Sequence, residues 1–183
     1  MIQDPAAARR YAQAVVPLAH GQGQLDALLD DLAAIQQLIE RQPMLARLLA
    51  TPEVEVADKR ELLTRLLKTQ VAPLALRLLL MLLSKGRLPL LPLVVAEGRR
   101  LRDEVQGIAR GVARSARPLS AATLKALEQR LGRRLGKQVI LTPAVDPSLI
   151  GGVTVSLDNT VFDGSVRRML EVLRERLATV RVA

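Results

Sequence analysis

The first hundred residues of the chain repeat apolar side chains at the spacing of amphipathic helices. Over residues 24–41, leucine and isoleucine recur at intervals of three and four, with acidic residues on the far side. This is the pattern of a helix with one apolar face. The same spacing predicts helices over 6–20, 43–50, 56–68 and 72–84, and a sixth ending near residue 104. Short links between five or six helices predict a compact helical bundle.

The fifth of these segments, residues 72–84, is apolar on nearly all sides. Its most hydrophobic part, Leu78 to Leu83, is six residues long. A membrane span needs about 20, so no spanning segment is expected. A soluble helix without a polar face is usually enclosed on all sides.

After residue 104 the apolar residues alternate, as they do in strands. Strands are predicted at 107–116, 138–145, 153–157 and 160–162, with Asp158-Asn159 as a tight turn before the last. Ser120 and Gly136 suit the start and end of a helix between the first two strands. Ser165 suits the cap of a last helix, whose apolar face carries Val166, Met169, Leu170, Leu173, Leu177 and Val180. The order β-α-β-β-β-α predicts a small α/β domain.

These patterns meet near residue 105 and divide the chain. We predict a mainly α protein with an N-terminal bundle of five to six helices at 1–105. A small α/β domain follows at 106–183.

The composition provides few of the side chains that catalytic sites use. The chain has no cysteine and a single histidine, His20, which excludes thiolate sites, a cysteine nucleophile and multi-histidine zinc sites. His20 falls on the polar side of its helix. Gly136-Lys137-Gln138 lacks the hydroxyl residue and the first glycine of a phosphate loop. We therefore expect no catalytic residue, no cofactor and no metal.

The charge is concentrated in the second part of the chain. Residues 1–104 carry 14 basic and 12 acidic side chains, a net charge of +2, whereas 105–183 carry 13 and 6, a net charge of +7. Such a field attracts acidic proteins, nucleic acids or anionic lipid. Tyr11 and Phe162 are the only aromatic residues, which argues against stacking on bases. Tight binding of RNA near physiological salt would support the nucleic-acid alternative.

Two motifs in the second part of the chain point to a family. Asp146-Pro147-Ser148-Leu149-Ile150-Gly151-Gly152 precedes a strand, and Asp163-Gly164-Ser165-Val166 opens the last helix. Together they resemble the signature of ATP synthase delta subunits, a family that includes the mitochondrial oligomycin sensitivity-conferring protein. Residues 8–14 and 86–88 also resemble that family, so the similarity extends over roughly residues 5–181. A helical adaptor unrelated to the synthase has no need of both motifs.

The resemblance implies a non-catalytic stator connector that couples rotation to ATP synthesis. Its N-terminal bundle is expected to bind N-terminal helices of alpha subunits, and its C-terminal domain the C-terminal helices of the stalk's b subunits. The resemblance further implies a peripheral location at the cytoplasmic face of a bacterial plasma membrane, within a proton-translocating complex.

The resemblance also implies a groove between the first and fifth helices for the alpha segment. Its residues would be Tyr11, Ala14, Val15, Leu18, Leu78, Met81 and Leu82. The fifth helix is apolar on nearly all sides, which agrees with such a groove, because one side can face the core and another the partner. The alternative is that these stripes belong to the core alone.

Two further sets of residues complete the prediction. A basic face is a candidate for contact with acidic stalk helices, the alternative being a solvated surface; it comprises Arg130, Arg133, Arg134, Arg167, Arg168 and Arg174. The signature residues are expected to be structural, in turns and at a helix start; they are Asp146, Gly151, Gly152, Asp163, Gly164 and Ser165.

Overall fold

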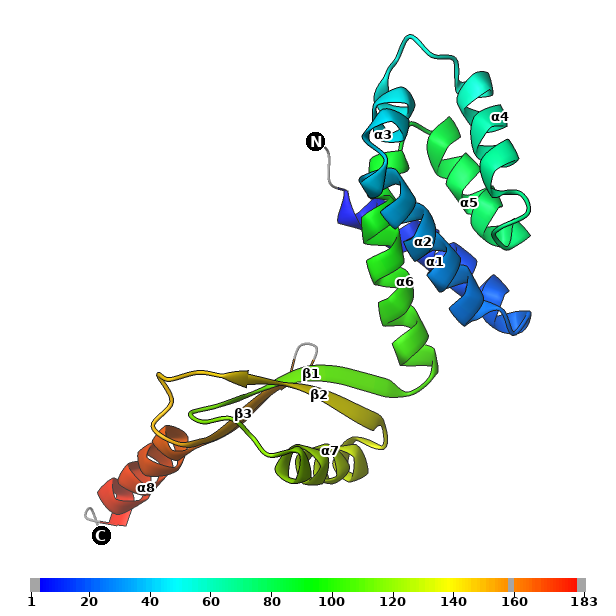
Figure 1. Ribbon diagram of the computed structural model, residues 1–183. Helices are drawn as coiled ribbons and strands as arrows, with labels where there is room; N and C mark the ends of the chain where they lie inside the picture. The colour runs from blue at the N-terminus through cyan, green and yellow to red at the C-terminus, as the bar shows by residue number, and fades with distance from the viewer. Residues whose placement is uncertain (1–3, 158–159, 181–183) are drawn as a thin grey trace. The chain divides into compact units, whose positions relative to one another are not determined.

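The computed structural model describes residues 4–157 and 160–180. The chain divides into two compact units, Met1–Arg102 and Asp103–Ala183 (Figure 1). Each unit has its own hydrophobic core. The predicted fold class, a helical bundle followed by a small α/β domain, is confirmed.

The N-terminal unit is built from helices that begin and end close to the predicted bounds. They are α1 (Pro5–Gly21), α2 (Leu25–Arg41), α3 (Pro43–Ala50), α4 (Val56–Leu67), α5 (Pro73–Ser84), the short 3-10 helix η1 (Leu88–Leu90) and α6 (Leu91–Val105). Proline occupies the first turn of α1, α3 and α5, where its missing N–H costs nothing and its fixed φ suits the helix. The Asp4 side chain accepts a hydrogen bond from the Ala7 N–H at 3.0 Å and caps α1.

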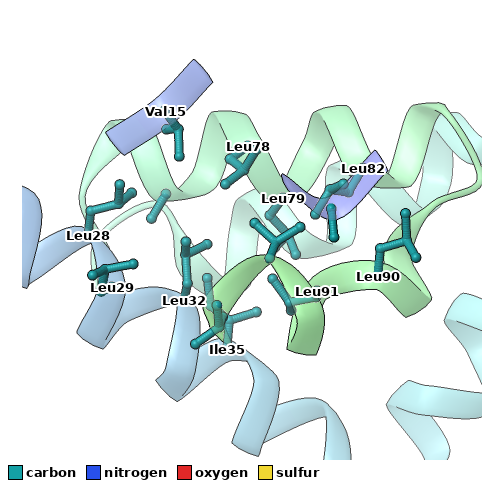
Figure 2. Packing of buried hydrophobic residues seen from close by; sticks show 14 of the residues in the cluster. Val15, Leu28, Leu29, Leu32, Ile35, Leu78, Leu79, Leu82, Leu90 and Leu91 are labelled. Atoms are coloured by element: carbon teal, nitrogen blue, oxygen red, sulfur yellow. The ribbon is translucent and has the colours of Figure 1, made fainter. Parts of the chain in front are cut away.

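The core of this unit consists of aliphatic side chains from all of its helices, most of them from α1, α2, α5 and α6. Leu32 of α2 and Leu79 of α5 are completely buried, and Leu91 of α6 is nearly so. Figure 2 shows these side chains converging with those of neighbouring turns. Helix α5 contacts α2, α4 and η1. These contacts on several sides explain why α5 is apolar nearly all round.

Two polar side chains link neighbouring helices of the bundle by hydrogen bonds at helix ends. Asp31 of α2 accepts a hydrogen bond from the Ala72 N–H at 2.7 Å, at the start of α5. Lys59 of α4 is buried, and its ammonium group donates to the Thr51 carbonyl at 2.6 Å, just beyond α3. Both bonds satisfy backbone groups that a helix end leaves without a partner.

The C-terminal unit is a four-stranded sheet with helix α7 packed on one face. Its elements are β1 (Ile108–Ser115), α7 (Ala121–Leu135), β2 (Gln138–Val145), β3 (Gly152–Leu157), β4 (Thr160–Ser165) and α8 (Val166–Val180). The strand order is β2-β1-β3-β4, with β1 and β2 parallel and the other pairs antiparallel. The predicted order of strands and helices is confirmed.

Leu131 of α7 lies over inward-facing residues of the strands, among them Ala113, Leu141 and Val155. Helix α7 is held to the edge strand β2 by a polar bond as well. The Glu128 carboxylate accepts the Leu141 N–H at 2.8 Å, so a backbone donor at this edge is not left open to strand pairing.

The last strand differs from the prediction in length. It continues through Asp163 and Gly164 to Ser165, because all six of its residues are in register with β3. Asp163 therefore lies in a strand rather than in a turn. The predicted Asp158-Asn159 turn lies outside the described residues.

Candidate functional site

The structure divides the predicted groove residues of α1 and α5 into a buried and an exposed set. Val15 and Leu78 are 5% exposed and Leu82 is completely buried, so these three belong to the core. This corrects their assignment to an open groove. Figure 2 shows all three side chains within the cluster of buried residues.

The exposed set remains available to a partner. Leu18 of α1 is 58% exposed and Met81 of α5 is 51% exposed, while Ala14 is exposed and Tyr11 is half-buried. We call Tyr11, Ala14, Leu18 and Met81 the α1/α5 surface. An Arg87 N–H group donates to the Tyr11 hydroxyl at 3.4 Å and links α1 to the segment that follows α5.

The predicted basic face is not one continuous set. Arg130, Arg133 and Arg134 belong to α7, whereas Arg167, Arg168 and Arg174 belong to α8. Figure 1 shows α7 beneath the sheet and α8 leading away from the sheet, beyond β4. The two groups of arginines therefore occupy separate helices and separate places in the unit.

Three of these arginines are engaged within the unit. Arg133 Nε donates to the Gln129 carbonyl at 3.4 Å. The Arg134 guanidinium lies over the Phe162 ring, 5.9 Å from its centroid, within reach of a cation–π contact. Arg168 forms an ion pair with Glu171 at 3.5 Å. Arg134 thus contributes to the packing of α7 against β4, and only some of the six arginines offer an unshared charge.

The two signature segments come together where β3, β4 and α8 meet. Gly152 pairs with Ser165 and Val153 with Gly164 across β3 and β4, and the Val166 N–H donates to the Gly151 carbonyl at 3.0 Å. We call the residues Asp146, Gly151, Gly152, Asp163, Gly164 and Ser165 the signature bracket.

Close backbone approach accounts for two glycines of the bracket, Gly152 and Gly164. Gly152 has φ +84°, and a Cβ there would lie 2.3 Å from the Gly164 carbonyl oxygen. A Cβ at Gly164 would lie 3.0 Å from the Val153 carbonyl oxygen. Gly152 therefore requires a residue without a side chain, whereas a side chain at Gly164 would require the facing backbone to shift by a few tenths of an ångström.

Hydrogen bonds explain the polar residues of the bracket. Asp163 Oδ1 accepts the Ser165 N–H at 2.9 Å, and the Ser165 hydroxyl in turn accepts the Arg168 N–H at 3.2 Å, capping α8. Asp146 Oδ1 accepts the hydroxyl of Ser148 at 2.6 Å and its N–H at 3.0 Å, closing the turn after β2.

These bonds lower the pKa of both carboxyl groups. The pKa of Asp163 is lowered chiefly by the Ser165 backbone bond, with a smaller contribution from the nearby Arg168 charge. The pKa of Asp146 is lowered chiefly by the Ser148 hydroxyl and then by the Ser148 N–H. In both cases the bonds favour the ionised form, which is the better acceptor.

We expect Asp163→Ala to lower the free energy of unfolding of the C-terminal unit at neutral pH. The difference in unfolding free energy from the native chain should shrink as the pH falls. Because the folded pKa lies below the ordinary 3.8, the stabilisation by Asp163 is present above that value and is lost as pH falls through the folded pKa. Urea unfolding at pH 7 and at the lowest pH at which the native chain stays folded, followed through exchange of the α8 amides, measures the difference. Asp163→Asn, which keeps the acceptor oxygen, serves as control and should lose less at pH 7. An equal deficit for Asp163→Ala at both pH values would contradict this account.

Helix α8 carries an exposed apolar stripe that was predicted as a helix face but not as a site. Met169 is 63%, Leu170 55% and Leu173 53% exposed, and Val166 is half-buried. We call Val166, Met169, Leu170 and Leu173 the α8 stripe. The spacing was visible in the sequence, but only the structure shows that the sheet leaves the stripe uncovered.

Within the described residues, no group of three or more His, Asp or Glu side chains is placed to hold a metal ion. No helix in this part of the chain has the length and apolar character to cross a bilayer. Among the described residues, the α1/α5 surface and the α8 stripe are the apolar surfaces considered as candidate sites.

A helical bundle and a small α/β unit, each with an exposed apolar surface, define a two-domain protein suited to protein–protein contacts. Residues 7–177 match the family model described as "ATP synthase delta (OSCP) subunit". The chain therefore belongs to the ATP synthase delta (OSCP) subunit family, whose members are structural and not catalytic subunits.

Individual relatives agree with this assignment. The "ATP synthase subunit delta" of Desulfatibacillum aliphaticivorans is 35% identical over 93% of this chain and 93% of its own length. That of Symbiobacterium thermophilum is 36% identical over 96% of this chain and 95% of its own. Among solved structures, a chain of the Toxoplasma gondii mitochondrial ATP synthase hexamer is 27% identical with a TM-score of 0.61, covering 93% of this chain and 97% of its own.

Proposed function

We propose that the chain is the stator connector of an F-type ATP synthase, linking the catalytic head to the peripheral stalk. In this role the N-terminal bundle binds the N-terminal helix of an alpha subunit, and the C-terminal unit binds the C-terminal helices of the b subunits. The chain is then peripheral, at the cytoplasmic face of the bacterial plasma membrane. Rotor torque on the head is resisted through these two attachments, which couples rotation to ATP synthesis.

The observation that carries the proposal is the exposure of Leu18 and Met81 above a fully packed core. Large apolar side chains that are more than half exposed on adjoining core helices gain free energy when a partner covers them. An amphipathic helix laid on such a surface buries them without rearranging the bundle. Burial of each is worth roughly 1.5–3 kcal/mol, a substantial share of the about −12 kcal/mol of a nanomolar complex.

We propose that the stalk binds the C-terminal unit at the α8 stripe and at the arginines of α8. Leu170 and Leu173 offer apolar area, while Arg167 and Arg174 stand exposed on the same helix. A stalk helix with apolar and acidic positions is the matching partner. The arginines of α7 lie elsewhere in the unit and are proposed as a secondary contact.

We expect Leu18→Asp or Met81→Asp to weaken binding of the alpha N-terminal segment at least tenfold. A carboxylate placed on the buried side of the partner helix must be desolvated, and the lost apolar burial adds to that cost. Isothermal titration of the full chain with a synthetic peptide of about 20 residues, roughly the length of a 30 Å helix, measures the change.

Met44→Asp is the matched control, because Met44 is 82% exposed on α3, away from the α1/α5 surface. It should bind as the native chain does. No binding by the folded native chain would refute the alpha attachment. Native-like binding by both Asp variants would keep the attachment and move it off the α1/α5 surface.

A further inference from the structure

Strand β2 lies at one edge of the sheet, so one side of its backbone has no neighbouring strand. The strand order is β2-β1-β3-β4. The Gln138 N–H donates to the Gly107 carbonyl at 2.9 Å, just before β1, so even-numbered residues of β2 direct their backbone groups toward β1. Because backbone groups alternate sides along a strand, those of Val139, Leu141 and Pro143 point away from the sheet.

Two residues withhold hydrogen-bond donors from this edge. The Glu128 carboxylate of α7 accepts the Leu141 N–H at 2.8 Å. Pro143 has no N–H, and proline is tolerated in a sheet where its nitrogen faces away from the neighbouring strand. Of the outward positions 139, 141 and 143, two therefore offer no donor to an added strand.

The composition of β2 makes such protection necessary. Residues 138–145 include Val139, Ile140 and Leu141 in succession and carry no charged side chain. Short uncharged segments with high strand propensity and no proline assemble readily through their edges. Natural sheets often protect an edge strand with charged residues of its own. Here the strand has none, so its protection depends on Pro143 and on Glu128 of the neighbouring helix.

The arrangement of the edge identifies the partner that is kept out. If two β2 strands pair antiparallel about a two-fold axis at Leu141, Leu141 faces its own copy and Val139 faces residue 143 of the second chain. Uncharged residues meet along this pairing, so charge repulsion does not oppose it. We propose that the β2 edge is a latent pairing surface for a second copy of this chain, and that Glu128 and Pro143 keep the surface closed.

The opposite edge of the sheet has a similar contact. The Val166 N–H donates to the Gly151 carbonyl at 3.0 Å, so by alternation the Ser165 N–H points away from β3. The Asp163 carboxylate accepts that N–H at 2.9 Å and places a charge at the edge, which disfavours strand addition. A carboxylate thus occupies an outward backbone donor at each edge. The inference is independent of the proposed attachments, because it concerns strand edges and not the α1/α5 surface or α8.

Two substitutions reopen the β2 edge. Glu128→Ala removes the acceptor of the Leu141 N–H, and Pro143→Val restores the missing N–H with a residue that favours strands. Sedimentation equilibrium of the full chain over a range of concentrations measures self-association. We expect the double variant to associate about tenfold or more tightly than the native chain, with each single variant between the two, because every restored donor adds a bond in both copies.

Matched variants separate closure of the edge from general effects on packing. Glu128→Gln keeps an acceptor oxygen for the Leu141 N–H and should remain as monomeric as the native chain. Thr142→Val introduces the same valine at the adjacent position, whose N–H faces β1, and should not increase association. Gln129→Ala changes the neighbouring exposed residue of α7 and should leave association unchanged.

Hydrogen exchange locates the contact between the copies. In the double variant, protection of the amides at 139, 141 and 143 should rise with protein concentration while the rest of the sheet stays protected as in the native chain. If the double variant instead loses protection throughout the sheet, Pro143→Val alone, which keeps the Glu128 bond, takes its place in the comparison.

Three results would overturn the inference. The first is a folded variant with a reopened edge that associates no more than Thr142→Val does. The second is association without concentration-dependent protection of the β2 amides, which would place the contact elsewhere. The third is a native chain that already dimerises through β2, since Glu128 and Pro143 would then not close the edge.

Discussion

Gly152→Ala is expected to destabilise the C-terminal unit by on the order of 3 kcal/mol or more. Two effects add at this position. The backbone is held at φ +84°, where a residue with a Cβ costs roughly 1–2 kcal/mol. The new Cβ would also lie 2.3 Å from the Gly164 carbonyl oxygen and 2.9 Å from the Ser165 Cα, both backbone atoms that move only if β4 shifts.

Gly136→Ala separates these two effects. Gly136 ends α7 with φ +64°, but no atom lies within 4 Å of where its Cβ would be. It should therefore cost only the conformational part, about 1 kcal/mol. Hydrogen exchange of the β3 and β4 amides under increasing urea measures both variants. Tyr11 is the only tyrosine and the chain has no tryptophan, so tyrosine fluorescence reports the bundle, and its unfolding should be unchanged. Equal costs for the two alanine variants would refute the steric account.

The bracket shows how much of the site the sequence can predict. The pattern of glycine, aspartate and serine predicted structural roles, and the hydrogen bonds of Asp163 and Ser165 agree with a helix start. The spacing did not show that Asp163 is a strand residue. That placement depends on pairing with Thr154 of β3, a contact between segments whose register no local pattern specifies.

The helices of the bundle were predictable for a physical reason. A period of 3.6 residues identifies which side chains share a face, and glycine and proline mark the ends of the segments. The period does not say what covers a face. Val15 and Leu18 lie on the same side of α1, yet one is 5% and the other 58% exposed. Only the positions of the neighbouring helices decide which of them is core.

The basic residues of the C-terminal unit illustrate the same limit. Net charge located the positive field correctly in the second part of the chain. Net charge did not show that the arginines of α7 and those of α8 form two separate groups. A count of charges does not say where two helices lie around a sheet. Nor did composition reveal that Arg134 lies over Phe162. The α8 stripe was visible as a periodicity, but its exposure became visible only in the described fold.

Leu82→Ala is expected to destabilise the N-terminal bundle by about 2–5 kcal/mol. Leu82 is completely buried in the core of the unit, and truncation leaves a cavity that close-packed neighbours fill only in part. Alanine has the highest helix propensity, so the loss reflects packing and not the helix itself. For a unit of this size, each kcal/mol shifts the melting temperature by roughly 4–8 °C.

Met81→Ala is the matched control on the adjacent position of α5. Met81 is 51% exposed, and its truncation should change stability by no more than about 0.5 kcal/mol. Urea unfolding followed by Tyr11 fluorescence compares the two variants within the same unit. Together with the binding measurements, the pair assigns each position a role. Below its unfolding transition, Leu82→Ala should still bind the alpha peptide, because Leu82 presents no surface. Met81→Asp should stay folded and bind poorly. If Leu82→Ala instead lost binding while its fluorescence and helix content remained native, Leu82 would contact the partner after all, and the bundle would have to open between α1 and α5 to admit the alpha helix.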